Sequence, residues 1–246
     1  MIMDLETLIA SLPVLWAGAL RTLELMIYTL LCGFLIALPV AFARNSSAAG
    51  WRAFAHAFIF VFRGAPLLVI VFLLYYGLPQ VPGIKQTPVW LLIERPMPVA
   101  VLALSLNSAG FLAEIIAGAL RNVPVGEIEA GRAFGLNWLQ VLWRIIAPNA
   151  ARLGIRAYGN EVVFVLKGTA VVNFITITDL VGAANQVYFN TFDPITPLLV
   201  AGAMYLVVVF LILGLVGWAE RRLTPWKHVR IAPVRMSAAA VQEAKS

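Results

Sequence analysis

Long apolar stretches separated by short polar segments dominate the chain and predict membrane-spanning helices. The stretch 195–219 holds no charged residue and lies between Asp193 and Glu220. The stretch that ends at Arg44 is uncharged from residue 25, and with its weakly amphipathic start it predicts a helix over 20–43. A transmembrane helix needs about 20 mostly apolar residues, so both stretches are long enough to cross a bilayer.

Three further apolar stretches are interrupted but still predict spans. The stretch 97–121 begins beside prolines, which the first turn of a helix tolerates. The stretch 64–84 contains three prolines and follows the aromatic segment 51–62, which we expect at the membrane surface, and the predicted span is 57–81. The stretch 154–178 is the least typical because it carries charged and amide side chains. The chain is therefore expected to be an all-α integral membrane protein with five transmembrane helices.

Composition supports this fold class and limits what else the chain holds. Of its 246 residues 61% are hydrophobic and 12% are charged, whereas a soluble domain has about 25% charged residues. Five spans and one long loop leave no room for a separate aqueous domain. We expect one transmembrane domain over 1–228, with a mobile cytoplasmic tail over 229–246.

The positive charge is distributed unevenly along the chain, and its distribution predicts the orientation. The net charge of +6 could suggest a nucleic-acid partner, but the basic residues sit at the ends of the predicted spans. One side would collect most of them: Arg44, Arg52, Arg121, Arg132, Arg144, Arg152, Arg156, Arg221, Arg222, Lys227, Arg230 and Arg235. The other side has chiefly Arg21, Lys85 and Arg95. Because basic loops stay inside, the N-terminus is predicted outside and the C-terminus inside, with the lipid bilayer and not nucleic acid as the surrounding partner.

The loop over 122–152 is polar and yet predicts helices. A short helix from Glu127 to Phe134 would be closed by Gly135 as a C-terminal glycine cap. Asn137 can then cap a second helix over 138–146, and Pro148 is expected to end it. The predicted orientation places this helix, turn and helix in the cytoplasm.

Two interpretations of the loop remain open from its residues alone. Ala130, Ala133 and Phe134 share one helical face, which permits close approach by a groove in a partner. Trp138, Trp143 and Arg144 equally suit an amphipathic hairpin that rests on lipid headgroups.

The spacing within the loop resembles the EAA motif of ATP-binding-cassette (ABC) importer permeases. The motif is carried by Glu129-Ala130-Gly131, Gly135, Ile145 and Ala147-Pro148, with Gly131 in place of the usual second alanine and Ala147 in place of leucine. Other segments are similar to permeases of polar amino-acid importers, so the resemblance covers about 20–228. These segments are 63–68, 113–115, 118–124 and 159–161. The runs 126–130 and 219–222 most resemble the M-type subunits of histidine, lysine-arginine-ornithine and octopine or nopaline importers.

The resemblance implies a type I ABC importer permease fold, a periplasmic N-terminus and a place in the bacterial inner membrane. It implies that this chain is not an enzyme and binds no cofactor, with ATP and Mg on a dimer of partner ATPase subunits. It also implies a second permease subunit of the Q type, or a second copy of this chain, and a periplasmic solute-binding protein. The residues expected to dock the ATPase are Glu129, Ala130, Gly131, Arg132, Gly135 and Pro148. The solute would be a polar or basic amino acid or an opine.

Polar residues inside the predicted spans are candidates for a solute path, since ionisable groups in a membrane are costly. Glu161, beside Asn160, could hold the cationic end of a solute or pair with an arginine on a neighbouring helix. Lys167 lies on nearly the same face and could meet a carboxylate or extend to the headgroups. Asn107, Ser108 and Thr169 could line the path or join helices to one another.

Two other function classes compete with the importer interpretation. An ion-coupled secondary transporter could use Glu161 and Glu114 for protons, but such proteins usually contain internal repeats, which we do not find. An intramembrane enzyme would need a nucleophile with a base or a metal cluster, and the sequence carries no motif of that kind.

Overall fold

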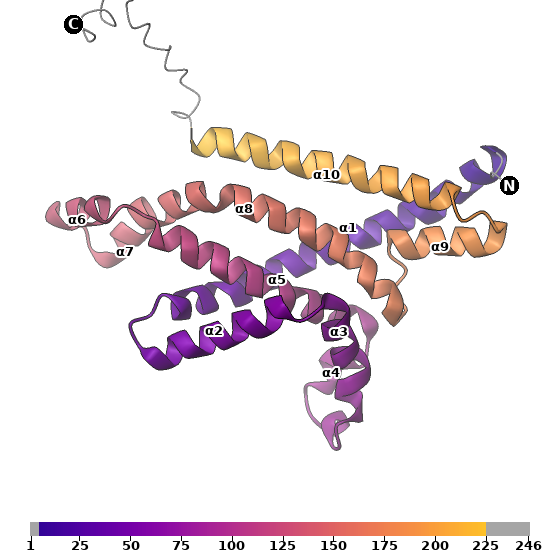
Figure 1. The fold of residues 1–246 in the computed structure, drawn as a ribbon, viewed down its shortest axis with the longest axis horizontal. Coiled ribbons are helices and arrows are strands. Elements are labelled where there is room, and N and C mark those ends of the chain that lie inside the picture. Colours follow the sequence, from indigo (N-terminus) through magenta and orange to yellow (C-terminus); the bar gives the residue numbers. More distant parts are fainter. Residues whose placement is uncertain (1–4, 225–246) are drawn as a thin grey trace, which may run out of the picture.

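The computed structural model describes residues 5–224, and almost all of this part of the chain is helical (Figure 1). The tail expected over 229–246 lies outside the described residues. The helices are α1 Leu5–Arg44, α2 Ala49–Gly64, α3 Leu67–Phe72, η1 Leu73–Gly77, η2 Leu78–Gln80, η3 Ile84–Gln86, α4 Trp90–Ile93, α5 Pro96–Arg121, α6 Val125–Ala133, α7 Trp138–Val141, η4 Leu142–Ile146, α8 Ala147–Gly168, η5 Thr169–Ile175, α9 Leu180–Thr191 and α10 Thr196–Leu223.

Three helices of the described chain are each long and apolar enough to cross a membrane: α1, α5 and α10. Two bent pairs also pass by length and composition, so up to five spans are possible. The first pair joins α2 to the segment 67–80 with a bend of 102°, and the second joins 138–175 to α9 with a bend of 50°.

The first helix is longer than the sequence suggested. It was expected over 20–43, but α1 begins at Leu5 and includes Pro13 and Pro39. Helices in membranes tolerate internal proline because neighbouring groups satisfy the freed carbonyls. The amphipathic start is therefore the first part of the same helix and not a separate element.

The prediction of a single helix over 57–81 is wrong. The structure forms α2 up to Gly64, and the chain then bends at Ala65, whose φ is −76° and ψ 137°. The cause is Pro66, because a proline pushes the preceding residue out of the helical region. The aromatic segment that was expected to lie before the second helix is itself most of α2.

The loop's second helix does not end at Pro148, which corrects another expectation. The chain stays helical from α7 through the π-helical turn η4 and into α8, where Pro148 occupies the first turn. Proline inside a helix removes one backbone hydrogen bond and crowds the preceding turn, and the wider π-helical turn η4 lies directly before it. The fourth helix expected over 154–178 is thus α8 followed by η5, and it ends where Thr176 takes a φ of 69°.

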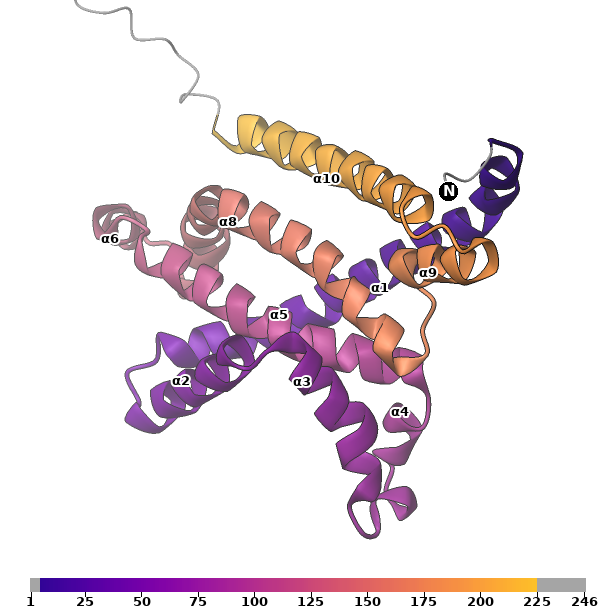
Figure 2. The same ribbon diagram turned by 45° about the vertical axis from the view of Figure 1, so that its right-hand side comes forward.

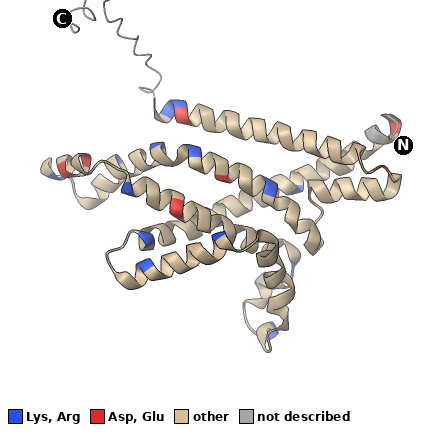
Figure 3. Ribbon diagram, in the orientation of Figure 1, with Lys and Arg blue, Asp and Glu red and all other residues tan. Residues whose placement is uncertain are grey.

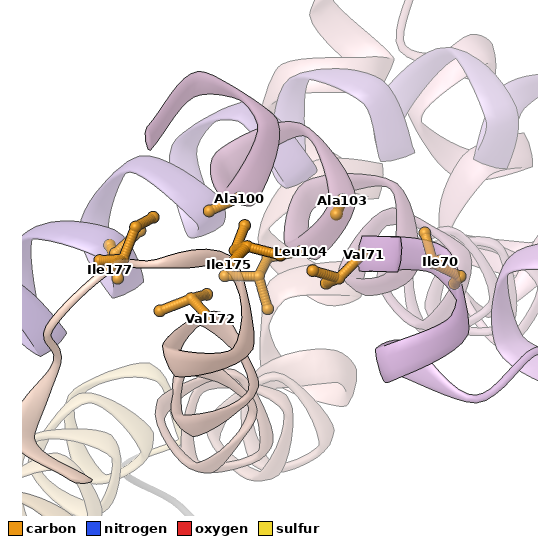
Figure 4. Close-up of a cluster of buried hydrophobic side chains, with 9 residues drawn as sticks. Ile70, Val71, Ala100, Ala103, Leu104, Val172, Ile175 and Ile177 are labelled. Carbon is orange, nitrogen blue, oxygen red and sulfur yellow. The ribbon is translucent and has the colours of Figure 1, made fainter. Parts of the chain in front are cut away.

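A cluster of buried apolar side chains packs α1, α3 and η5 against the first half of α5 (Figure 4). Ala100, Ala103 and Leu104 of α5 meet side chains of α3 and η5, and Leu25 of α1 completes the cluster. The other members are Ile70, Val71, Val172, Ile175 and Ile177. Small side chains on α5 let the helices approach closely, as is usual where lipid provides no hydrophobic driving force.

The contact between α8 and α10 is close at one buried glycine. Gly159 is buried, and a Cβ there would lie 2.7 Å from Val216 Cγ1. We expect Gly159→Val to lower thermal stability in detergent by about 1–3 kcal/mol, the usual cost of overpacking.

The matched controls are a neighbouring glycine and a compensating variant. Gly154→Ala should be neutral, because a Cβ at that position would lie 3.6 Å from Ala119 Cβ in ordinary contact. Adding Val216→Ala to Gly159→Val should restore part of the loss. A Gly159→Val protein as stable as the parent would contradict this packing of α8 on α10.

Candidate functional site

Several helix ends meet at one end of the bundle, and most of the basic residues are found there (Figures 1 and 3). Arg44 of α1 pairs with Glu114 of α5 at 3.2 Å, and Arg156 of α8 pairs with Glu220 of α10 at 2.7 Å. The loop that carries α6 projects from this same end (Figure 2). The described basic residues assigned to this end are Arg44, Arg52, Arg121, Arg132, Arg144, Arg152, Arg156, Arg221 and Arg222.

The glycine cap predicted at Gly135 is observed, in a complete form. Gly135 has a φ of 77°, and its amide donates to Arg132 O at 2.9 Å. The amide of Leu136 donates to Gly131 O at 3.1 Å, which makes this the two-bond Schellman ending of a helix. The turn between α6 and α7 is therefore fixed by backbone hydrogen bonds.

The start of α7 is fixed in the same way. Asn137 Oδ1 accepts from Gln140 N at 2.9 Å, and Gln140 Oε1 accepts from Asn137 N at 2.9 Å. This reciprocal pair is a capping box, which satisfies two amides that the helix cannot. The sequence analysis predicted Asn137 as a cap but not the reciprocal bond. A glutamine three residues after the cap, Gln140, is the sequence signal for such a capping box.

The six residues expected at a docking surface do not all lie on it. Glu129, Ala130, Arg132 and Gly135 are exposed, but Gly131 is buried. A Cβ on Gly131 would collide with Ile145 Cδ1, so the glycine lets α6 pack on the following helix. Pro148 is half-buried in the first turn of α8 and does not lie on the exposed surface of the loop.

An apolar side chain stands out on the exposed part of the loop. Phe134 follows α6 and is 88% exposed. A phenyl ring on a rigid, charged loop is a strong candidate for insertion into a partner's pocket, since aromatic residues are enriched where partners bind.

The loop is also tied to α8 through side chains. Asn149 Nδ2 donates to Glu127 Oε2 at 2.5 Å, and Arg152 NH1 donates to Asn149 Oδ1 at 3.3 Å. A side-chain hydrogen bond thus joins α6 to the first turn of α8.

A second candidate site is an open groove of about 430 Å³ between α5 and α8. Ser108 of α5 donates to Glu161 Oε1 of α8 at 2.8 Å, and Glu161 is 5% exposed. The groove is lined by Arg63, Phe111, Glu114, Ile115, Ala157, Asn160, Glu161 and Phe164. Asn107 is buried nearby and donates to Phe62 O at 2.7 Å.

Four of the six polar residues singled out in the spans are thus brought together, and two are not. Asn107, Ser108, Asn160 and Glu161 lie at or beside the groove. Lys167 is exposed and is not among the lining residues. Thr169 is buried and donates to Leu166 O at 2.8 Å within its own helical segment.

The groove also contains a cation, Arg63, which lies near the end of α2. It packs against Gly110 in the middle of α5. Its guanidinium carbon lies 5.0 Å from the centre of the Phe111 ring. The groove therefore offers both a carboxylate and a guanidinium.

Comparison with known proteins gives a consistent picture. The profile of a family described as "Binding-protein-dependent transport system inner membrane component" matches residues 29–225. The nopaline transport system permease protein NocM of Agrobacterium fabrum is 38% identical over 238 residues, covering 96% of this chain and 99% of NocM. The histidine/lysine/arginine/ornithine transport system permease protein HisM of Escherichia coli K12 is 35% identical over 226 residues, covering 89% and 94%.

Solved structures are similar as well. The crystal structure of an amino acid ABC transporter with histidines matches with a TM-score of 0.78 at 30% identity, covering 90% of this chain and 100% of that one. An inward-facing MetNI methionine ABC transporter matches with a TM-score of 0.69 at 21% identity, covering 86% and 96%, and is similar in fold.

Proposed function

The chain belongs to the family of binding-protein-dependent transport system inner membrane components, and we propose that it is the membrane-spanning permease subunit of an ATP-driven ABC importer for polar or basic amino acids or opines. The fold supports this assignment through its likeness to an amino acid ABC transporter. The ion-coupled secondary transporter considered from the sequence receives no support from these comparisons.

One observation carries the proposed coupling role: a rigid helical loop presents Phe134 and charged residues away from the bundle. Its turn is fixed by backbone hydrogen bonds at Gly135, and Glu127 in the first turn of α6 accepts a hydrogen bond from Asn149 of α8. A lipid-resting hairpin would not need such fixation, whereas a lever that transmits movement does. We therefore assign α6 and the turn after it as the docking element for an ATPase subunit.

The orientation is part of the proposal. The bundle end that carries the loop also carries most of the described basic residues, which the positive-inside tendency places in the cytoplasm. With each bent pair counted as one crossing, five spans put the N-terminus in the periplasm and the C-terminus in the cytoplasm. The loop then lies where ATP is available, in a bacterial inner membrane.

The complex would contain more than this chain. Two ATPase subunits, which bind and hydrolyse ATP with Mg, dock on the loops of two permease subunits. The second permease is a Q-type partner, with a homodimer as the other possibility, and a periplasmic binding protein delivers the solute. The groove between α5 and α8 is open on one side, which suits a path that the second permease completes.

Mechanistically, ATP binding and solute delivery favour the same conformation of the permease pair. Closure of the ATPase dimer moves α6, and α8 follows because Asn149 and Glu127 join them. Since Glu161 lies on α8, the groove changes its accessibility with that movement. Binding on either side of the membrane thereby shifts one shared equilibrium.

Labelling of the loop tests this proposal. In a Cys32→Ser background, Phe134→Cys should react with a membrane-impermeant maleimide in inside-out vesicles and not in right-side-out cells. Co-expression of the ATPase subunit should protect the cysteine. Reaction from the outside, or equal labelling with and without the ATPase, would contradict the docking assignment.

The matched control is Trp51→Cys on α2, which is exposed at the same end of the bundle but away from α6. Its labelling should not change when the ATPase is present. Protection at both positions would mean that the ATPase covers this whole end of the bundle and does not dock specifically on α6.

A further inference from the structure

An ionic cluster lies where α1 and α5 end, between the groove and the loop. Glu114 places one carboxylate oxygen 3.2 Å from Arg44 Nε and the other 3.1 Å from Arg121 NH2. One carboxylate thus joins the last residue of α1 to the last residue of α5.

Asn45 closes the cluster into a ring of contacts. Its Oδ1 accepts from Arg121 NH1 at 3.2 Å, and its Nδ2 donates to Ala117 O at 3.1 Å. The four polar side chains therefore fix the end of α1 against two turns of α5.

The packing beneath the cluster is close. Ala37, Ala41, Ala113 and Ala117 are all fully buried between α1, α2 and α5, beside the larger Leu112. Small side chains let the helices approach closely, so α1 and α5 are in tight apolar contact just below the polar cluster. The polar cluster adds directional contacts where both helices end.

Glu114 belongs to the groove as well as to the cluster. It lines the groove together with Phe111 and Glu161, and on α5 it lies six residues after Ser108, which bonds Glu161. That spacing corresponds to about 9 Å along a helix. Arg121, its other partner, is the last residue of α5 and precedes α6 by only a short connection.

We propose that Glu114, held by Arg44 and Arg121, is a positioning residue that couples the solute groove to the ATPase-docking loop. The ring of contacts makes α1 move with the end of α5, so that movement of α6 reaches the groove wall. Without the ring, α6 still docks the ATPase, but α1 no longer follows. This inference rests on the proposed function and adds a specific route for its coupling.

Glu114→Gln in the complete transporter, reconstituted in proteoliposomes with the binding protein, tests the inference. The ATPase should co-purify at the parent yield. Stimulation of ATP hydrolysis by the solute-loaded binding protein, and solute moved per ATP, should each fall by about fivefold or more. A purely structural carboxylate would lower yield and thermal stability while leaving the ratio of solute to ATP unchanged.

A second variant keeps the inference testable if Glu114→Gln fails to fold. The side chain of Arg121 is 44% exposed, so Arg121→Gln should fold normally and yet uncouple to a similar degree. Combining it with Glu114→Gln should add little, because both remove the same contact. Arg121→Lys, which keeps the charge, should restore part of the coupling.

The control is Glu94→Gln, which removes an exposed carboxylate 3.7 Å from Arg95 in the segment just before α5. It should transport like the parent. Coupling within twofold of the parent in both Glu114→Gln and Arg121→Gln would overturn the inference. Failure of the parent itself to show ATP-driven uptake would instead count against the proposed function.

Discussion

Gly135→Asp is expected to reduce ATPase co-purification at least about tenfold, which corresponds to roughly 1.4 kcal/mol of binding free energy. A Cβ at Gly135 would have no atom within 4 Å, although the φ of 77° is one that residues with a side chain rarely adopt. The loss arises because the carboxylate would be unpaired in the docking interface, which costs roughly 2–5 kcal/mol. Co-purification from detergent-solubilised membranes, with the permease quantified in the same sample, measures the effect.

Two comparisons separate charge from backbone shape. Gly135→Asn has nearly the same shape without the charge and tolerates a positive φ, so it should retain more ATPase than Gly135→Asp. Gly50→Asp places the same residue on α2, also in open space, and should bind the ATPase like the parent. Full ATPase yield with Gly135→Asp would mean that α6 and its turn are not the docking element.

Glu161→Gln is the second change with a large expected effect, a loss of cationic-solute uptake of about 10- to 100-fold. The amide oxygen can still accept from Ser108, so the contact between α5 and α8 is retained while the charge is removed. A hydrogen bond to a charged group contributes roughly 1.5–3 kcal/mol, which gives the expected range. ATP-driven uptake in proteoliposomes measures the loss, and ATPase co-purification should not change.

Ser108→Ala is the matched variant, because it removes the helix-to-helix contact and leaves the carboxylate in place. It should reduce uptake far less than Glu161→Gln does. If Ser108→Ala were the more harmful change and Glu161→Gln transported normally, Glu161 would serve helix packing and not the solute.

The loop shows how much local structure can be predicted from short-range signals. Gly135 and Asn137 act as predicted because caps depend only on backbone geometry and on residues within a few positions. Pro148 did not act as predicted, because the chain stays helical through the wider π-helical turn η4 just before it. Nothing in the sequence marks that turn.

The groove shows where sequence reasoning stops. The polar character of Asn160 and Glu161 could be seen in the sequence, but their partner Ser108 on another helix could not be assigned. The contact of Arg63 with Gly110 depends on where α2 ends beside α5, and the bend of 102° after α2 then sets the direction of the following segment. Proline predicts that a bend occurs but not its angle, and the angle decides which residues face each other.

Glu114 illustrates a related point. Its pairing with Arg121, two turns away on the same helix, follows from helical spacing. Its pairing with Arg44 requires the register between α1 and α5, which the small apolar residues of the contact do not specify from sequence.

Uptake into proteoliposomes tests the central claim most directly. The complete assembly, with both permease subunits, the ATPase and the solute-loaded binding protein, should accumulate amino acid or opine only when ATP is supplied on the side of the loop. An ion gradient without ATP should drive no uptake, either by the assembly or by this chain alone. Gradient-driven uptake by the isolated chain, or ATP-independent accumulation by the assembly, would contradict the account.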